Sequence, residues 1–360
     1  MKKDRNSDLK KRFAPTLLKW NKDKNVRKMP WKGEKDPYKI WLSEIILQQT
    51  RVEQGLGFYN QFVHTFPDIN KLAKAADERV FKLWEGLGYY SRCRNLLITA
   101  RVISKEMNGV FPNSYENILA LKGIGPYTAA AISSFAFNLP YAVIDGNVFR
   151  VLSRVFGIST ATDTTAGKKL FSALAEELLD KKQPGLYNQA IMDFGAVICK
   201  PAAPQCNDCV FKKVCFAYTH NLTSQLPVKE KKINLKNRWF YYIVMEYKEE
   251  VVVVQRTGKD IWKDLYEFPL IEAKKALNKQ AIIKSIEKNK WLTSDAFEVM
   301  NVSPFYKQQL SHQLIKGQFI VIKLRRKMKK MPGWKWISKE KLKRFAFPQF
   351  INQYLKAKPF

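Results

Sequence analysis

Long apolar runs are missing from this sequence of 360 residues. No stretch approaches the roughly 20 consecutive apolar residues that a membrane-spanning helix needs, which excludes an integral membrane protein built from helices. Cysteine is also scarce, with five in the chain, and the charged start MKKDRNSDLKKR lacks the apolar core of a secretory signal. A disulfide framework is therefore not expected, and the sequence predicts a soluble cytoplasmic protein.

Acidic residues are the third scarce class. Asp and Glu number 32 against 63 Lys and Arg, which gives a formal net charge of +31. The basic excess is concentrated in two clusters, residues 1–35 with 13 basic and 4 acidic side chains, and residues 316–344 with 12 and 1. An excess of this size predicts a polyanionic partner such as nucleic acid.

The distribution of apolar residues predicts two kinds of domain. Residues 8–220 repeat apolar side chains at intervals of three and four, as in KIWLSEIILQQT, which is typical of helices. From Trp239 onward, runs such as WFYYIVMEY and EVVVVQR are typical of strands. We therefore expect a multidomain protein with an all-α region over residues 1–217, a polar linker over 218–237 and an α+β domain over 238–360.

Four of the five cysteines lie in the segment CKPAAPQCNDCVFKKVC, at Cys199, Cys206, Cys209 and Cys215. Reduced thiolates with the spacing C-x6-C-x2-C-x5-C can converge on one metal centre. Zinc and an iron–sulfur cluster are both compatible with this spacing. Cys93 lies outside the quartet, and we interpret it as an ordinary packing residue.

The segment LKGIGPYTAAAI, residues 121–132, predicts a turn that opens a helix. Gly123 and Gly125 permit backbone conformations that other residues resist, and Pro126 suits the first helical turn. Exposed N–H groups at the start of this helix can hold a phosphate group. A plain tight turn is the alternative interpretation, and the basic charge of the chain favours the phosphate site.

The motifs described above follow one another along the chain in the same order as in a known protein family. The hairpin, the segment VIDGNVFRVLSRV and the cysteine quartet resemble the endonuclease III superfamily of DNA glycosylases. The segments MPWKGEKDPYKIWLSEIILQQTRVE and GLGYYSRCRNL are similar to adenine DNA glycosylases of the MutY type. The resemblance runs from about residue 27 to the linker. It implies a helix-hairpin-helix at residues 115–133 and a [4Fe-4S] cluster held by the four cysteines in a loop at residues 199–215.

Two carboxylates suit the reaction that this resemblance implies. Cleavage of an N-glycosidic bond needs an acid to protonate the base and an anion to stabilise the electron-poor sugar. Glu44 lies in the apolar segment IWLSEIILQQ, so desolvation should raise its pKa and suit it to the acid role. Asp145 precedes a helix, where backbone N–H groups favour the ionised form. The resemblance assigns these two roles, with Asn147 and Tyr127 as supporting polar groups.

Other residues match positions that contact DNA in the resembling family. Leu47, Gln49 and Tyr89 match residues that wedge into the duplex when the target base leaves the stack. Helix periodicity alone would place Leu47 and Tyr89 in the core. Arg27 and Lys32 match basic residues around the adenine pocket. Lys32 departs from the usual arginine, which loses a planar fork of hydrogen-bond donors.

The segment QRTGKDIWKDLYEFPL resembles the opening of a MutT-like, Nudix-type domain. The clustered glutamates of a pyrophosphatase do not follow it, so this domain is expected to bind and not to hydrolyse. In the glycosylase family that this chain resembles, a Phe-Ser-His loop of this domain recognises 8-oxoguanine. Here that loop contains Leu310, Ser311 and His312, so the aromatic residue is replaced. A polar turn between strands is the alternative interpretation of this loop.

The sequence thus predicts a monofunctional adenine DNA glycosylase that removes adenine opposite 8-oxoguanine or G in base excision repair. Double-stranded DNA is its expected partner, a monomer its expected state, and the bacterial nucleoid its expected place of action. One alternative is a bifunctional glycosylase with lyase activity, but the lysine that such enzymes use is replaced by Tyr127. A non-catalytic DNA-binding protein is the other, and it would need neither Glu44 nor Asp145.

Overall fold

The computed structural model of this chain describes residues 2–230, 234–328 and 331–357. Parts of the predicted linker and of the second basic cluster, residues 231–233 and 329–330, lie outside the described residues. The chain forms two compact units. The first comprises Met1–Lys74 and Asn95–Lys231, and the second comprises Ala75–Arg94 and Lys232–Phe360.

This division differs in one respect from the expected domains, because residues 75–94 join the second unit. Within that unit, the Lys82 ammonium donates to the Phe345 carbonyl at 3.0 Å, and the Phe347 N–H donates to the Glu85 carboxylate at 2.8 Å. The domain boundaries 1–217, 218–237 and 238–360 therefore stay a prediction from sequence.

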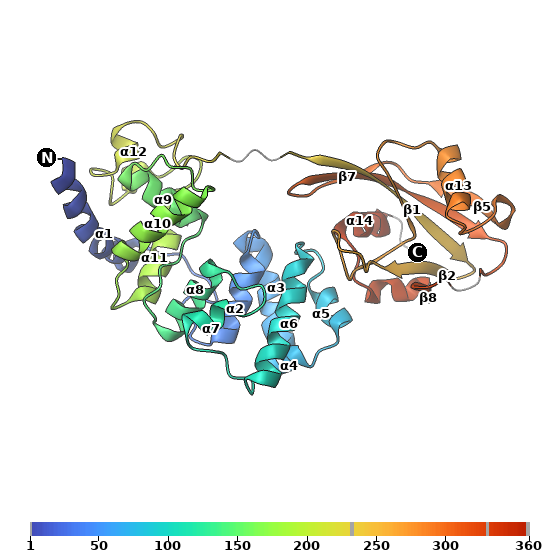
Figure 1. The fold of residues 1–360 in the computed structure, drawn as a ribbon, viewed down its shortest axis with the longest axis horizontal. Coiled ribbons are helices and arrows are strands. Elements are labelled where there is room, and N and C mark those ends of the chain that lie inside the picture. Colours follow the sequence, from blue (N-terminus) through green and yellow to red (C-terminus); the bar gives the residue numbers. More distant parts are fainter. Residues whose placement is uncertain (1, 231–233, 329–330, 358–360) are drawn as a thin grey trace. The chain divides into compact units, whose positions relative to one another are not determined.

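The first unit is built from helices joined by loops, the cysteine loop at residues 199–215 among them (Figure 1). Its helices are α1 (Lys2–Lys24), α2 (Pro37–Leu47), α3 (Val52–Thr65), α4 (Ile69–Ala73), most of α6 (Tyr90–Glu106), α7 (Tyr115–Leu119), α8 (Pro126–Phe137), α9 (Gly146–Phe156), α10 (Thr165–Leu178), α11 (Pro184–Val197) and α12 (Phe216–Thr219), with a 3₁₀ turn at Cys206–Asp208. Across the described ranges, no helix combines the length and apolar character needed to cross a membrane.

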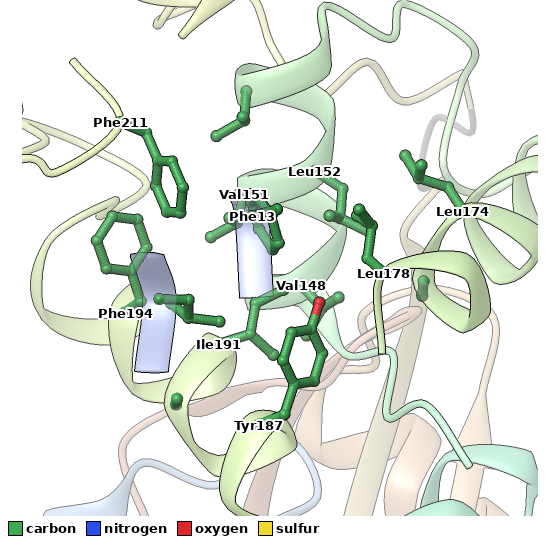
Figure 2. Close-up of a cluster of buried hydrophobic side chains, with 14 of the residues drawn as sticks. Phe13, Val148, Val151, Leu152, Leu174, Leu178, Tyr187, Ile191, Phe194 and Phe211 are labelled. Atoms are coloured by element: carbon green, nitrogen blue, oxygen red, sulfur yellow. The ribbon is translucent and has the colours of Figure 1, made fainter. Parts of the chain in front are cut away.

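The core of this unit holds α9 in place. Val148, Val151, Leu152 and Val155 follow helical spacing along α9, and each is at most 2% exposed. Figure 2 shows this apolar face of α9 packed against side chains from α1, α10, α11 and the cysteine loop. The partner side chains drawn and labelled there are Phe13, Leu174, Leu178, Tyr187, Ile191, Phe194 and Phe211. Packing on four segments fixes the start of α9, where Asp145 lies.

The second unit contains a mixed sheet and three helices within its described residues (Figure 1). Its strands are β1 (Lys236–Tyr247), β2 (Glu250–Gln255), β3 (Tyr266–Glu267), β4 (Leu270–Ala273), β5 (Phe297–Val302), β6 (Tyr306–Gln309), β7 (Gln313–Leu324) and β8 (Trp334–Ser338). Its helices are α5 (Asp77–Leu83), α13 (Lys279–Lys288) and α14 (Gln349–Ala357), with 3₁₀ turns at Ser294–Ala296 and Lys339–Arg344.

Strands β1 and β7 are parallel neighbours at the centre of this sheet, in the order β3-β2-β1-β7-β5. Residues 240–245 of β1 are all 0% exposed, because the sheet is covered on both faces. Tyr241 packs in the cluster that contains α13, whereas Tyr242 stacks on Phe319 on the face with α14. The expected α+β organisation of this part of the chain is confirmed.

Candidate active site

One cavity of the helical unit brings together predicted residues that lie far apart in the sequence. Glu44 and Leu47 come from α2, Tyr127 from the first turn of α8, and Asp145 from the residue before α9. Arg27, Gln49 and Asn147 also line this cavity, together with Gln189 and Met192 from α11. The cavity therefore contains both carboxylates that the sequence selected.

Glu44 is buried in this cavity, with 8% of its surface exposed. Burial raises the pKa of Glu44 to about 7; the hydrogen bond with Tyr127 opposes the rise, and the charge of Asp145 adds to it. The predicted elevation of the pKa is thus present, with desolvation as its main cause. A carboxyl group with a pKa near neutrality can carry a proton and release it to a bound base.

Asp145 caps helix α9. Its carboxylate accepts hydrogen bonds from the Val148 N–H at 2.8 Å and from the Asn147 side chain at 2.6 Å. The sequence predicted that these donors would dominate, but partial burial raises the pKa of Asp145 above its usual value, and the hydrogen bonds oppose that rise. Both carboxylates are therefore shifted in the same direction, and Asp145 differs from Glu44 in the donors that hold its charged form.

Two candidate wedge residues have a left-handed backbone. Gln49 has φ of 56° in the turn after α2, and Tyr89 has φ of 47° immediately before α6. Residues other than glycine adopt this conformation at a cost of about 1 kcal/mol or more, and such strain concentrates at functional sites. Leu47 is half-buried and lines the cavity, whereas Tyr89 is 44% exposed in the second unit.

The predicted helix-hairpin-helix is formed by α7, the turn after it, and α8. Gly123 has φ of +81°, and a Cβ there would lie 2.6 Å from the Asn95 side chain, so glycine is required. Gly125 differs from the prediction. Its φ of −101° is accessible to any residue, and a Cβ there would meet nothing within 4 Å. Gly125 therefore contributes open space in front of the α8 N-terminus, with Pro126 as the first helical residue.

The four cysteines of the quartet line one small cavity of the helical unit, together with Arg154. Arg154 is 3% exposed and donates to the Cys199 sulfur at 3.5 Å and to the Lys200 carbonyl at 2.7 Å. Within the described residues, no three His, Cys, Asp or Glu side chains are arranged to hold a single metal ion. Four thiols around one cavity with an adjacent guanidinium fit an anionic iron–sulfur cluster. Cys93 is buried elsewhere in the chain, as expected of a packing residue.

The loop containing Leu310, Ser311 and His312 lines a cavity of the second unit together with Tyr89. The Tyr89 hydroxyl and the Ser311 hydroxyl share a hydrogen bond of 2.5 Å. The structure thus places a predicted wedge residue beside the predicted lesion-reading loop, within one compact unit.

Comparison with known proteins identifies the family. Residues 42–178 match the HhH-GPD superfamily of base excision DNA repair proteins, and residues 240–357 match the NUDIX domain. The adenine DNA glycosylase of Buchnera aphidicola subsp. Baizongia pistaciae is 36% identical over 301 residues, which cover 83% of each chain. The chain belongs to the adenine DNA glycosylase family. The human adenine DNA glycosylase is 39% identical to this glycosylase over 57% of the chain and 39% of the human protein.

Solved structures of DNA glycosylases share the fold of the helical part of this chain. A thermostable thymine-DNA glycosylase aligns with a TM-score of 0.55 at 32% identity, covering 60% of this chain and 99% of that one. An endonuclease III–DNA complex aligns with a TM-score of 0.51 at 17% identity, covering 59% and 96%, and supports the fold alone. This glycosylase is a DNA N-glycosylase of base excision repair whose partner is DNA, and the predicted family, fold class and enzyme class are confirmed.

Asp193 on α11 is a residue of this glycosylase that the sequence interpretation missed. It is 0% exposed and accepts hydrogen bonds from Arg27 at 2.9 Å, Lys32 at 3.0 Å, Gln189 at 3.0 Å and Asn25 at 2.8 Å. Because a carboxylate accepts and does not donate, Gln189 must use its NH₂ group for this bond. Asp193 thus explains why lysine is tolerated at position 32, since Lys32 contacts Asp193 and does not line the cavity.

Arg150 on α9 connects the candidate active site of this glycosylase with the cysteine loop. Its guanidinium donates to the Asn147 side chain at 2.8 Å and to the Cys199 carbonyl at 2.7 Å. Asn147 in turn donates to Asp145. A continuous series of hydrogen bonds therefore joins a catalytic candidate to a cluster candidate. The sequence contains a signal for this role, since Arg150 lies between apolar residues in VFRVL and such an arginine is buried only when it has partners. The sequence interpretation assigned Arg150 no role.

Proposed function

We propose that this glycosylase is monofunctional and removes adenine paired with 8-oxoguanine or G. Glu44 donates a proton to the adenine, the N-glycosidic bond breaks, and its electron pair leaves with the base. The carboxylate of Asp145 stabilises the oxocarbenium-like sugar until water adds to the anomeric carbon. The water gives up a proton to the Glu44 carboxylate, which restores the acid and leaves free adenine and an abasic site. The observation that carries the proposal is the single cavity that contains Glu44, with its pKa of about 7, and Asp145.

Supporting roles follow from the contacts around these two carboxylates. Asn147 holds the Asp145 carboxylate, and Tyr127 holds the Glu44 carboxyl group. Arg27 forms the basic wall of the pocket and is held by Asp193, which Lys32 also contacts from outside the lining of the cavity. Leu47 and Gln49 fill the space that the flipped adenine leaves in the duplex. Gly123 and Gly125 allow the hairpin to approach the phosphate backbone.

We further propose that Cys199, Cys206, Cys209 and Cys215 hold a [4Fe-4S] cluster. When bound, the cluster would supply a rigid cross-link for the loop, and we expect the adjacent Lys212 and Lys213 to contact phosphate groups of DNA. The enzyme acts as a monomer on DNA in the bacterial cytoplasm, where thiols stay reduced.

Cluster binding is tested by the metal content of the purified protein. Wild type is expected to contain iron and sulfide and to absorb visible light, and Cys206→Ala is expected to lose most of both because a thiolate ligand is removed. Cys93→Ala is the matched control and should retain the cluster, since Cys93 is buried outside this loop. Zinc without iron or sulfide in wild type would contradict the proposal.

Monofunctional chemistry is tested by the fate of the abasic strand. Wild type should leave this strand uncut until alkali or heat is applied, and borohydride should trap little covalent complex, because Tyr127 offers no amine for a Schiff base. Tyr127→Lys is expected to gain measurable trapping. Efficient trapping with the wild-type enzyme would show that another amine acts as the nucleophile.

Lesion recognition is tested at the loop of the second unit. Replacing both Ser311 and His312 by Ala should reduce the preference for adenine opposite 8-oxoguanine over adenine opposite G by roughly 5-fold to 150-fold, since a good base contact contributes about 1 to 3 kcal/mol. Single-turnover rates on the two duplexes measure this ratio. The salt dependence of binding should stay largely unchanged because the double variant removes no lysine or arginine. A double variant with full preference would leave the loop as a plain turn.

A further inference from the structure

A charged network centred on Arg238 of β1 is hydrogen-bonded to Gln313, the residue that follows the loop of residues 310–312. Arg238 is 7% exposed, and all five of its guanidinium donors are used. Two pair with the Asp260 carboxylate at 2.9 and 2.6 Å, and two pair with the Glu272 carboxylate at 2.7 Å each. The fifth bond, of 3.0 Å, reaches the side-chain oxygen of Gln313.

Two of these partners belong to the cavity that contains Ser311 and His312. Asp260 lies in the segment 260–263 that forms one wall, and Gln313 directly follows the loop that forms another. Arg256 reinforces the first wall by donating to Asp260 at 2.9 Å and to the Ile261 carbonyl at 3.0 Å. Arg238 therefore bonds to residues in two separate walls of the cavity, Asp260 and Gln313.

Gln313, which Arg238 holds at its side chain, is also hydrogen-bonded to the backbone of the 310–312 loop. The Leu310 N–H donates to the Gln313 carbonyl at 2.7 Å, which closes a four-residue turn around Ser311 and His312. The Lys236 N–H donates to the His312 carbonyl at 3.0 Å. Since Gln313 is held at its side chain by Arg238 and at its backbone by Leu310, movement of Arg238 would change the position of the turn.

We propose that Arg238, acting through Gln313, is a positioning residue for recognition of the base opposite adenine. Its rigid fork of donors sets the separation between segment 260–263 and the 310–312 loop before DNA binds. Selectivity for a hydrogen-bonding pattern requires donors and acceptors held in place, so a loop released from Arg238 discriminates less. This inference rests on the proposed role of the second unit in lesion recognition.

Gln313 offers the sharper test, because its replacement leaves the ion pairs of Arg238 with Asp260 and Glu272 intact. Gln313→Leu removes the acceptor and is expected to lower the preference for 8-oxoguanine over G by about tenfold, the effect of one misplaced base contact. Gln313→Glu keeps an acceptor for Arg238 and should retain a preference close to that of wild type. Gln318→Leu removes a hydrogen bond of 2.8 Å from the Gln318 side chain to the Ser303 carbonyl elsewhere in the same unit and is the matched control.

The measurements are single-turnover excision from the two duplexes, the melting temperature, and hydrogen exchange of the Leu310 amide. Faster exchange at Leu310 in Gln313→Leu, with an unchanged melting temperature, is the expected signature of a released turn. Full preference in Gln313→Leu overturns the role of Arg238 and leaves lesion recognition standing. Equal losses in Gln313→Leu and Gln313→Glu would assign Gln313 to direct base contact and also overturn it. A wild type without preference overturns the proposed lesion recognition and this inference together.

Discussion

Replacement of Glu44 by Gln is expected to reduce adenine excision by about 100-fold to 10,000-fold, the usual contribution of a general acid. The amide keeps the shape of the side chain but has no acidic proton to transfer to the base, so catalysis should be lost while affinity for the duplex stays near the wild-type value. Single-turnover excision and equilibrium binding on the same duplex measure the two quantities. Substantial excision by this variant would remove Glu44 from the acid role.

The pH dependence of excision provides an internal check on this assignment. Burial raises the pKa of Glu44 to about 7, and only the protonated form can donate, so the excision rate should fall as pH rises through about 7. Asp145 must be ionised to stabilise the sugar, so the rate should also fall at low pH. The residual rate of Glu44→Gln should lack the decline above neutrality. A wild-type rate that increases through this range would indicate that Glu44 acts as a base.

Removal of the Asp193 carboxylate is expected to destabilise the helical unit strongly. Asp193→Ala leaves Arg27 and Lys32, which are about one-quarter exposed, without their shared counter-ion. Breaking a buried ion pair from one side costs about 3 kcal/mol, which corresponds to a decrease in melting temperature of roughly 8 °C for a unit of this size. Excision should weaken as well, because Arg27 and Gln189 lose the group that orients them.

Glu177→Ala is the matched control for this experiment. Glu177 forms an ion pair with Lys10 in the same unit, and their side chains are 54% and 31% exposed. Exposed ion pairs contribute at most about 1 kcal/mol, so this variant should melt close to wild type. If Asp193→Ala and Glu177→Ala had the same melting temperature, the buried carboxylate of Asp193 would not stabilise the helical unit.

Local features of the site were predictable from the sequence because their causes are local. The apolar neighbours of Glu44 on α2 predicted the desolvation that raises the pKa of Glu44. The segment DGNVFRV predicted a cap at Asp145, since the bond from the Val148 N–H spans three residues. The conformation at Gly123 followed in the same way from the turn that precedes Pro126. The direction of the Asp145 pKa shift could not be predicted from the local sequence, because the shift depends on burial by distant segments.

The family, the division into a helical part and a strand-containing part, and the residue types available for chemistry could all be predicted from the sequence. Which of these residues come into contact is visible only in the folded chain. Asp193 contacts Arg27 and Lys32, which lie 166 and 161 positions away in the sequence. Arg150 joins Asn147 to Cys199 by hydrogen bonds. Residues 75–94 belong to the second unit. Such contacts depend on how helices and strands pack, and one-dimensional patterns record which face of an element is apolar without recording what lies opposite it.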